Sequence, residues 1–447
     1  MKALALSLAI VLAGCTVGPD YQRPKIVPPT VYRGDVNAST SSLGDEKWWA
    51  VFDDTVLQKL IHTALAQNYD VRIAATRILQ AQARLGITRA DQFPTISGSL
   101  AFSAQKIPFG KFAATQLQAA IFYDFDFWGR YRRATEAARA NLLASEWNQR
   151  TVVATLVSGV ASAYFQLREL DLEMEISQRT LASRRESLTL TETLANGGAT
   201  SLLDVKQAQQ LVETAAFAVP ELQRQIALAE DALSDLLGQY PSDIPRGKPL
   251  TEQPLPPAVP AGLPSHLLEH RPDIQEAEQN LIAANAEIGV ARAQLFPDVS
   301  LTGAGGGAAN GLSHIGTVYS LTAGVTQQIF NAGRLRSNVR LSEAQEQQQL
   351  LAYQQTIQTA FREVSDALAS YQRTRESREH LELLTAAARD ASSLSDLRYR
   401  GGAASYLEFL TNETNFFTAE LNLARARLAE RLSLVQLYNS LGGGWEQ

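Results

Sequence analysis

The chain repeats itself after about 200 residues. A shift of 203 residues places Arg84–Pro94, which reads RLGITRADQFP, on Glu287–Pro297, which reads EIGVARAQLFP. At a shift of 204 residues, Gly197–Ala199 coincides with Gly401–Ala403. This period is far longer than the 20 to 50 residues of solenoid repeats, so we interpret it as the duplication of a whole structural unit.

The duplication predicts two structural repeats, 51–238 and 265–442, joined by the linker 239–264. The linker holds eight of the seventeen prolines in the chain. Proline removes a backbone donor and fixes φ, so we expect an extended connection rather than a helix. The remaining segments are an N-terminal tail, 15–50, and a short C-terminal tail, 443–447.

Each repeat contains one segment with the alternating pattern of a β-hairpin, about 94–127 in the first and about 297–330 in the second. Gln116 and Gln118 fall on one face of the expected strand. The other face collects apolar residues: Leu117, Ala119, Ile121, Tyr123, Phe125 and Phe127. A period of two indicates a strand, and strands of about nine to eleven residues can cross a bilayer. The expected strands have this length.

Two stretches of 67 residues, 130–196 and 334–400, contain no proline and only one glycine, Gly159. At a rise of 1.5 Å per residue, each would form a helix of about 100 Å. Apolar residues recur every seven positions in the first stretch, at Val153, Val160, Leu167, Met174, Leu181, Leu188 and Ala195, with Leu156, Ala163 and Leu170 at the second heptad position. Such heptads predict coiled-coil packing.

Pairs of glycines follow both long helices, at Gly197, Gly198, Gly401 and Gly402. Glycine adopts the left-handed backbone conformation that commonly ends a helix. We therefore expect each long helix to turn back on a partner helix at these glycines.

The N-terminus, 1–14, reads as a signal peptide, with Lys2 before a short apolar segment. It ends in Leu12-Ala13-Gly14-Cys15, which resembles the lipobox of bacterial lipoproteins. The resemblance implies a covalent lipid on Cys15 and, because Thr16 rather than Asp follows, sorting to the outer membrane. An ordinary signal peptide with an incidental cysteine is the alternative. After residue 15 no apolar run reaches 18 residues, so further membrane contact would require strands.

The composition excludes several other classes of function. A net charge of −6 offers no basic surface for nucleic acid. The glycine-rich run Gly303–Ala308 matches a loose dinucleotide pattern but lies in an expected strand. His266 and His270 are four residues apart without a metalloprotease motif, and we interpret them as a surface pair. We therefore predict no catalytic residues, no metal site and no cofactor apart from the lipid on Cys15.

Four strands cannot close a barrel, and open sheet edges in lipid would leave backbone groups unsatisfied. The chain must therefore oligomerise if the strands enter a membrane. Two copies would give eight strands and a filled interior, whereas three would give twelve and room for a pore. Ten of the 34 aromatic residues lie between residues 93 and 131, as expected for interfacial girdles. A soluble sheet core is the alternative for these aromatic residues.

Several motifs together carry a family resemblance. They are the CTVGPDY run of Cys15–Tyr21, Arg23-Pro24, Trp48-Trp49, and Arg271-Pro272-Asp273-Ile274. With them, essentially the whole mature chain resembles the TolC-type outer-membrane factors of the lipoprotein (NodT) branch. His270 and Asp54 depart from the family pattern, where arginine and proline are usual.

The resemblance implies a mainly α fold with internal duplication and a transmembrane β-barrel. It further implies a homotrimer whose 12-stranded barrel is continuous with a long periplasmic α-helical coiled-coil barrel. Such a protein is the passive exit duct of a tripartite efflux pump in a Gram-negative outer membrane, with a periplasmic adaptor and an RND-type inner-membrane transporter as partners. A lipid-anchored periplasmic coiled-coil scaffold without a pore is the alternative function.

The resemblance also implies a periplasmic aperture. Leu407 and Glu408 would constrict it, and Thr411 takes the place of a second acidic residue. Asp204 matches a carboxylate that latches the closed tip, but Ala404 replaces its usual basic partner. The alternative is that both acids are solvated residues in the first turn of a helix, stabilised by the helix dipole.

Overall fold

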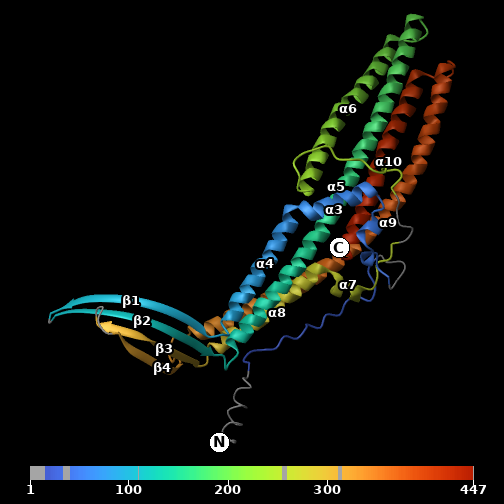
Figure 1. Ribbon diagram of the computed structural model, residues 1–447. Coiled ribbons are helices and arrows are strands. Elements are labelled where there is room, and N and C mark those ends of the chain that lie inside the picture. Colours follow the sequence, from blue (N-terminus) through green and yellow to red (C-terminus); the bar gives the residue numbers. More distant parts are fainter. Residues whose placement is uncertain (1–15, 34–40, 109, 254–258, 311–314, 446–447) are drawn as a thin grey trace. The chain divides into compact units, whose positions relative to one another are not determined.

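A computed structural model describes residues 16–33, 41–108, 110–253, 259–310 and 315–445 (Figure 1). The predicted signal peptide 1–14 and the predicted lipidation site Cys15 lie outside the described residues. The chain divides into two compact units. The sheet unit comprises Met1–Ile26, Ala75–Asn148 and Asp273–Thr356, and the helical unit comprises Val27–Ala74, Gln149–Pro272 and Ile357–Gln447. Both units draw on both predicted repeats.

The order of elements is the same in the two halves of the chain. After η1 (Leu43–Asp45) and α2 (Trp48–Val51), the first half contains α3 (Thr55–Gln67), α4 (Tyr69–Ala90), β1 (Thr95–Ile107), β2 (Gly110–Phe125), α5 (Arg130–Asn196) and α6 (Leu202–Leu236). The second half contains α7 (Pro264–His270), α8 (Pro272–Ala293), β3 (Asp298–Asn310), β4 (Ile315–Thr326), α9 (Arg334–Arg400) and α10 (Tyr406–Ser440). The long helices α5 and α9 both have 67 residues, and the helices that follow them, α6 and α10, both have 35.

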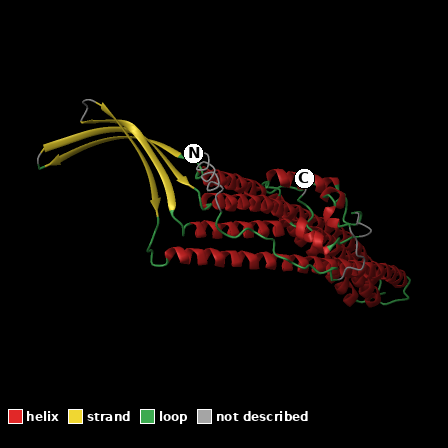
Figure 2. Ribbon diagram, turned by 90° about the horizontal axis from the view of Figure 1, so that it is seen from below, coloured by secondary structure: helices red, strands yellow, loops and turns green. Residues whose placement is uncertain are grey.

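The four strands form one antiparallel sheet (Figure 2), and their order in the sheet is β1-β2-β3-β4 (Figure 1). Ile96 pairs with Ile121, Ile121 with Gly303, and Gly303 with Leu321. Directly paired residues share a face, so these four positions form one row across the sheet. Ile96 and Leu321 are 77% and 75% exposed, which leaves large apolar side chains of this face uncovered within the single chain.

The opposite face of the sheet carries small and polar side chains in the neighbouring row. Ser97 pairs with Ala120, Ala120 with Ala304, and Ala304 with Ser320. The glycine-rich run Gly303–Ala308 lies inside β3, where an added Cβ at Gly306 would come within 1.9 Å of a carbonyl oxygen of β2. The run is therefore a close-packed strand. Among the described helices, none is both long and apolar enough to cross a bilayer.

The core of the helical unit collects large side chains from its N-terminal, central and C-terminal segments. Trp48, Leu57, Leu167 and Tyr438 are at most 1% exposed. The Tyr438 hydroxyl donates a 2.7 Å hydrogen bond to the Glu46 carbonyl. Burial of each such side chain stabilises the unit by about 1.5–3 kcal/mol, so these residues hold the N-terminal tail against the end of α10.

The buried carboxylate of Asp54, a departure from the family pattern, organises the start of α3. It accepts hydrogen bonds from the Val56 amide at 2.8 Å, the Tyr164 hydroxyl at 3.0 Å and the Gln253 side chain at 2.6 Å. Burial alone would raise the pKa of Asp54, but the hydrogen bonds from Gln253, Val56 and Tyr164 bring it below its ordinary value. Because Gln253 belongs to the linker, this carboxylate fixes the linker against α3 and α5.

Candidate functional site

The two glycine turns of the helical unit have the same backbone geometry. In the first, the Ala199 amide donates to the Leu194 carbonyl at 2.8 Å and the Gly198 amide to Ala195 at 3.0 Å. In the second, the Ala403 amide donates to the Arg398 carbonyl at 2.8 Å and the Gly402 amide donates to the Tyr399 carbonyl at 3.0 Å. Both are Schellman motifs, in which the glycine takes a left-handed conformation.

Gly198 and Gly402 occupy that position, with φ of 74° and 70°. Gly197 and Gly401 precede them and keep negative φ, with amides that donate to the last turns of α5 and α9. The turn therefore requires glycine at the second residue of each pair, because an L-side chain at positive φ is strained.

Asp204 is part of a capping box at the start of α6. The Asp204 amide donates to the Ser201 hydroxyl oxygen at 3.2 Å, and the Asp204 carboxylate accepts from the Ser201 amide at 3.0 Å. The Thr200 hydroxyl also donates to this carboxylate. These bonds, led by the one from Thr200, lower the pKa of Asp204 against a small opposing effect of burial. The Asp204 carboxylate therefore caps the N-terminus of α6, the helix to which it belongs.

Glu408 occupies the equivalent position of α10 but has a different partner. The Ser405 hydroxyl accepts from the Glu408 amide at 3.3 Å, whereas the Glu408 carboxylate forms an ion pair with Arg398 of α9, Nε to Oε1 3.1 Å. Both side chains are exposed, so this pair contributes little stability. Glu408 is thus an exposed residue of the first turn of α10 whose amide is capped by Ser405 and whose carboxylate forms an ion pair across the turn.

An aromatic cluster lies under the second turn. Tyr399 stacks on Phe409 with 5.7 Å between ring centroids, and Tyr406 meets both rings. Ala208 of α6 completes the buried cluster, and leucines of α5 pack around it. Burial first, and then the nearby Glu413 charge, raise the pKa of Tyr406. The cluster joins the ends of the two helical hairpins.

The remaining predicted aperture residues form an exposed strip on the first turns of α10. Leu407 is 59% exposed, although Tyr406 and Phe409 beside it are buried. The Thr411 hydroxyl donates to the Leu407 carbonyl at 2.8 Å, within the same helix. Leu407, Glu408 and Thr411 therefore share one face, opposite the aromatic cluster. A large apolar side chain beside a carboxylate on this face is available to meet another surface.

Sequence reasoning missed an ionic seam between α5 and α10. Arg184 pairs with Glu413 at 2.9 Å, Arg179 with Glu420 at 2.6 Å, and Arg425 with Glu173 at 2.8 Å. The Arg184 side chain is only 3% exposed.

The signal for this seam was present in the heptad pattern. The second heptad position, followed beyond Leu170, falls on Ser177, Arg184 and Thr191, which are at most 3% exposed. The outer half of α5 therefore keeps its buried seam but fills it with polar residues. Continuing the register, instead of stopping where apolar residues end, would have identified it.

Glu169 extends this seam along α5. Burial, followed by the charge of Glu173 and a hydrogen bond with it, raises the pKa of Glu169 well above its ordinary value. Arg425 opposes this shift. The physical reason is that a second negative charge beside a buried carboxyl group disfavours its ionised form.

This geometry can be compared with known proteins. The family model for the outer membrane efflux protein matches residues 60–239 and 263–443, which include both hairpins, both turns and all four strands. The chain belongs to this outer membrane efflux protein family.

Curated relatives of this efflux protein match over its full length. The cation efflux system protein CusC of Escherichia coli is 35% identical over 463 residues, covering 100% of this chain and 99% of CusC. The probable efflux pump outer membrane protein TtgC of Pseudomonas putida is 37% identical, covering 100% of this chain and 96% of TtgC.

Solved structures agree with the sequence comparison. The open state of the Neisseria gonorrhoeae MtrE outer membrane channel superposes with a TM-score of 0.90 at 31% identity, covering 97% of this chain and 99% of MtrE. The prediction of a TolC-like fold with four strands per chain is confirmed, as is that of an efflux channel protein of the Gram-negative outer membrane. The family assignment favours the channel over the scaffold.

Proposed function

We propose that three copies of the chain form a homotrimer that serves as the passive outer-membrane exit duct of a tripartite efflux pump. Their twelve strands would close one barrel, and their long helices would continue it as a periplasmic coiled-coil tube. An RND-type inner-membrane transporter would supply solutes and energy through a periplasmic adaptor. The lipid on Cys15 would anchor the tail, and the repeats 51–238 and 265–442 would be descendants of one duplicated unit.

The amphipathic sheet is the observation that carries this proposal. Among the described strands of one chain, the outer edges of β1 and β4 have no neighbouring strand. One face exposes large apolar side chains such as Ile96 and Leu321, and the other carries small and polar ones such as Ser97 and Ser320. A barrel from several chains would pair the edges, turn the apolar face to lipid and the polar face to water.

Migration and conductance test the oligomer and the pore. We expect the purified protein to run as a trimer in mild detergent without heating, to dissociate on boiling, and to conduct ions in planar bilayers. Cys15→Ser should abolish attachment of the lipid, while the barrel keeps the chain in the membrane fraction. A monomer without conductance would refute the duct.

We further propose that Leu407, Glu408, Thr411 and Asp204 line the periplasmic aperture. Three copies would place Glu408 in a ring of carboxylates, each accompanied by Arg398, its partner at 3.1 Å. Carboxylate rings favour cations. Because Asp204 is already used in its own capping box, Glu408 is the acid that would govern selectivity, with Asp204 acting through the position of α6.

Two charge variants test this aperture in opposite directions. Glu408→Gln should lower the cation preference of the trimer, and Arg398→Gln should raise it, since each leaves the partner charge uncompensated. Glu221→Gln, on the exposed Glu221–Arg224 pair of α6, is the matched control and should change nothing. Equal selectivity in all three variants would remove Glu408 from the pore while leaving the trimeric duct itself untouched.

A further inference from the structure

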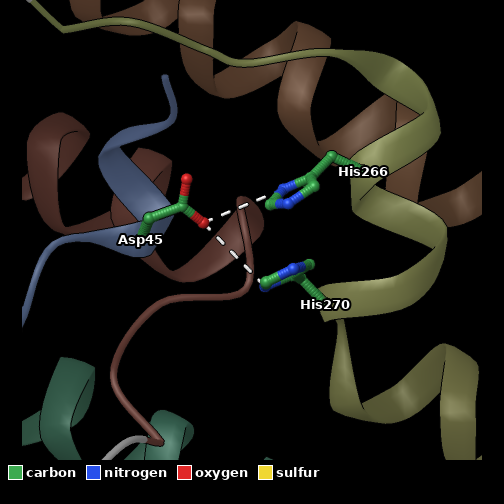
Figure 3. A group of neighbouring side chains, drawn as sticks. All are labelled: Asp45, His266 and His270. Carbon is green, nitrogen blue, oxygen red and sulfur yellow. Dashed lines mark ion pairs between the residues drawn. The ribbon is translucent and has the colours of Figure 1, made fainter. Parts of the chain in front are cut away.

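Three potential metal ligands meet in the helical unit. Sequence analysis interpreted His266 and His270 as a surface pair, but the fold adds Asp45 of η1, more than 200 residues away in the sequence (Figure 3). Asp45 Oδ1 lies 3.8 Å from His266 Nδ1 and 3.9 Å from His270 Nδ1. The ligand atoms of the three side chains all lie within 4.8 Å of one another.

The backbone holds the two segments together at this point. His266 and His270 are one turn apart on α7, with their rings stacked at 3.7 Å between centroids. Just before α7, the Pro260 carbonyl accepts from the Leu43 amide at 2.9 Å, and Ala261 bridges to Ser42. These contacts place η1 opposite the histidine face of α7.

The Asp45 carboxylate is oriented by its own capping box. Asp45 Oδ2 accepts from the Ser42 amide at 3.3 Å, so Oδ1 is the oxygen that faces the two imidazoles. A carboxylate whose orientation is fixed by a hydrogen bond therefore faces two imidazoles of one helix, as metal ligands held by outer partners do.

Space for solvent ligands adjoins the three side chains. A cavity of about 220 Å³ is lined by them together with Glu46, Tyr438, Trp445 and the glycines Gly44, Gly442 and Gly444. Each of the three side chains is 41–42% exposed, so an ion could enter from solvent.

We propose that Asp45, His266 and His270 bind a divalent transition-metal ion of the Zn²⁺ type. Two imidazole nitrogens and one carboxylate oxygen, with water completing the shell, are a ligand set that zinc uses. At metal–ligand bonds of about 2.0–2.2 Å, tetrahedral ligand atoms lie about 3.3 Å apart. The two aspartate–histidine distances of 3.8 and 3.9 Å would therefore close by less than about 1 Å, and no pair of the ligand atoms, which all lie within 4.8 Å, would close by more than about 1.5 Å.

The ion would join two parts of the chain, and a third part lies beside them. Asp45 belongs to the N-terminal tail and both histidines to α7. Gly44 beside Asp45 is so close to the end of α10 that an added Cβ would lie 2.6 Å from the Leu441 carbonyl oxygen. Metal binding would therefore fasten the tail at the junction of α7 and α10, a role independent of conduction through the duct.

Zinc titration of the full-length protein tests this site. The protein is purified in detergent with a histidine-free tag, stripped of metal and titrated with Zn²⁺ by calorimetry, with stoichiometry checked by mass spectrometry of the metal. We expect one Zn²⁺ per chain. Asp45→Asn, His266→Gln and His270→Gln should each weaken Zn²⁺ binding by about 100-fold. Loss of a residue that only hydrogen-bonds to a metal ligand already weakens metal binding by about 10–100-fold, so loss of a ligand itself should reach the upper end of that range.

The variants and controls are chosen to separate binding from folding. Asp45→Asn keeps an oxygen that accepts from the Ser42 amide, so the tail stays in place, and undisturbed migration of the oligomer verifies folding of each variant. His380→Gln, at an exposed position of α9, is the matched control and should bind as the parent protein does. X-ray absorption at the zinc edge should reveal two imidazole ligands. Absence of stoichiometric binding, or ligand variants that bind Zn²⁺ as tightly as the parent protein does, would refute the site and leave only an aspartate–histidine ion pair.

Discussion

The two glycine turns of the helical unit have the same backbone and different side-chain support. Both end in a Schellman motif with glycine at positive φ, and a serine caps the helix that follows. The first turn keeps its acid, Asp204, within its own capping box, whereas the second directs Glu408 across the turn to Arg398. The rings of the second turn form a buried aromatic cluster, to which the first hairpin contributes Ala208 and leucines of α5.

This difference shows that the two repeats share the backbone requirement of the turn but differ in the side chains that support it. The position of Tyr406 in the second turn is that of Leu202 in the first, and the two residues are 4% and 71% exposed. We infer that one turn is anchored by packing and the other by hydrogen bonds of its cap.

The largest expected effect separates the two anchors. Tyr406→Ala should lower the free energy of local opening of the second turn by about 3–5 kcal/mol, because it empties a buried aromatic site. Leu202→Ala, its counterpart in the first turn, should stay within about 0.5 kcal/mol. Hydrogen exchange of peptides covering the two turns measures both. Equal losses in the two turns would contradict the assignment of different anchors.

The backbone requirement should be equal in the two turns. Gly198→Ala and Gly402→Ala should each cost about 1–2 kcal/mol, since an L-residue is strained at positive φ. An added Cβ at either position meets no atom within 4 Å, so strain alone is measured. Gly197→Ala, at negative φ, is the matched control and should cost less. The same exchange measurement decides, and a clear inequality between Gly198 and Gly402 would end the claim of one shared backbone.

The two serine caps should contribute differently to stability, because Ser201 belongs to a reciprocal capping box and Ser405 only accepts one bond from the Glu408 amide. Ser201→Ala should cost about 1 kcal/mol, because it removes a hydroxyl from a reciprocal capping box. Ser405→Ala should cost less, since the Glu408 carboxylate is engaged with Arg398. Replacement by threonine should restore most of the stability in both turns. A larger loss at Ser405 than at Ser201 would reverse the interpretation.

Added salt should reduce the contribution of the Arg398–Glu408 ion pair to the stability of the second turn. Arg398→Gln should lower its opening free energy by about 0.2–1 kcal/mol at low ionic strength, the usual range for an exposed pair. At 1 M salt, where the Debye length is about 3 Å, the difference should vanish. If the loss persists in high salt, Arg398 acts through its 3.3 Å hydrogen bond to the Ala403 carbonyl instead of through charge.

Acid should weaken the first turn through Asp204, and this is the smallest of the expected effects. The pKa of Asp204 in the folded chain lies below its ordinary value of 3.8. Its contribution is therefore present above pH 3.8 and is lost as the pH falls through the folded pKa. Exchange corrected for intrinsic pH dependence should reveal this loss in the parent protein and not in Asp204→Asn. An equal acid response in that variant would assign the effect to another group.

Much of the fold followed from local rules. The absence of proline and the placement of glycine predicted two helices of 67 residues, and the structure has them at Arg130–Asn196 and Arg334–Arg400. The period of two placed the strands. The predicted apolar face of β2 is the face that registers with Ile96 and Leu321.

The candidate site was predicted less completely. The sequence predicted Glu408 from its position after the glycine turn. It did not predict the partner Arg398, because the ion pair depends on how the end of α9 lies against the start of α10. The heptad register, continued past Leu170, would have reached Arg184 but not its partner Glu413, because the offset between two antiparallel helices is set by packing along their whole length.

The sequence by itself determined the duplication, the lengths of helices and strands, and the residues at which the chain turns, because proline, glycine and periodicity act within a few residues. Only the tertiary structure decided which distant side chains meet. Asp45 joins His266 and His270, and Asp54 joins Tyr164 and Gln253, through contacts between segments far apart in the chain. The physical reason is that such meetings depend on the packing of several elements at once, which no local pattern records.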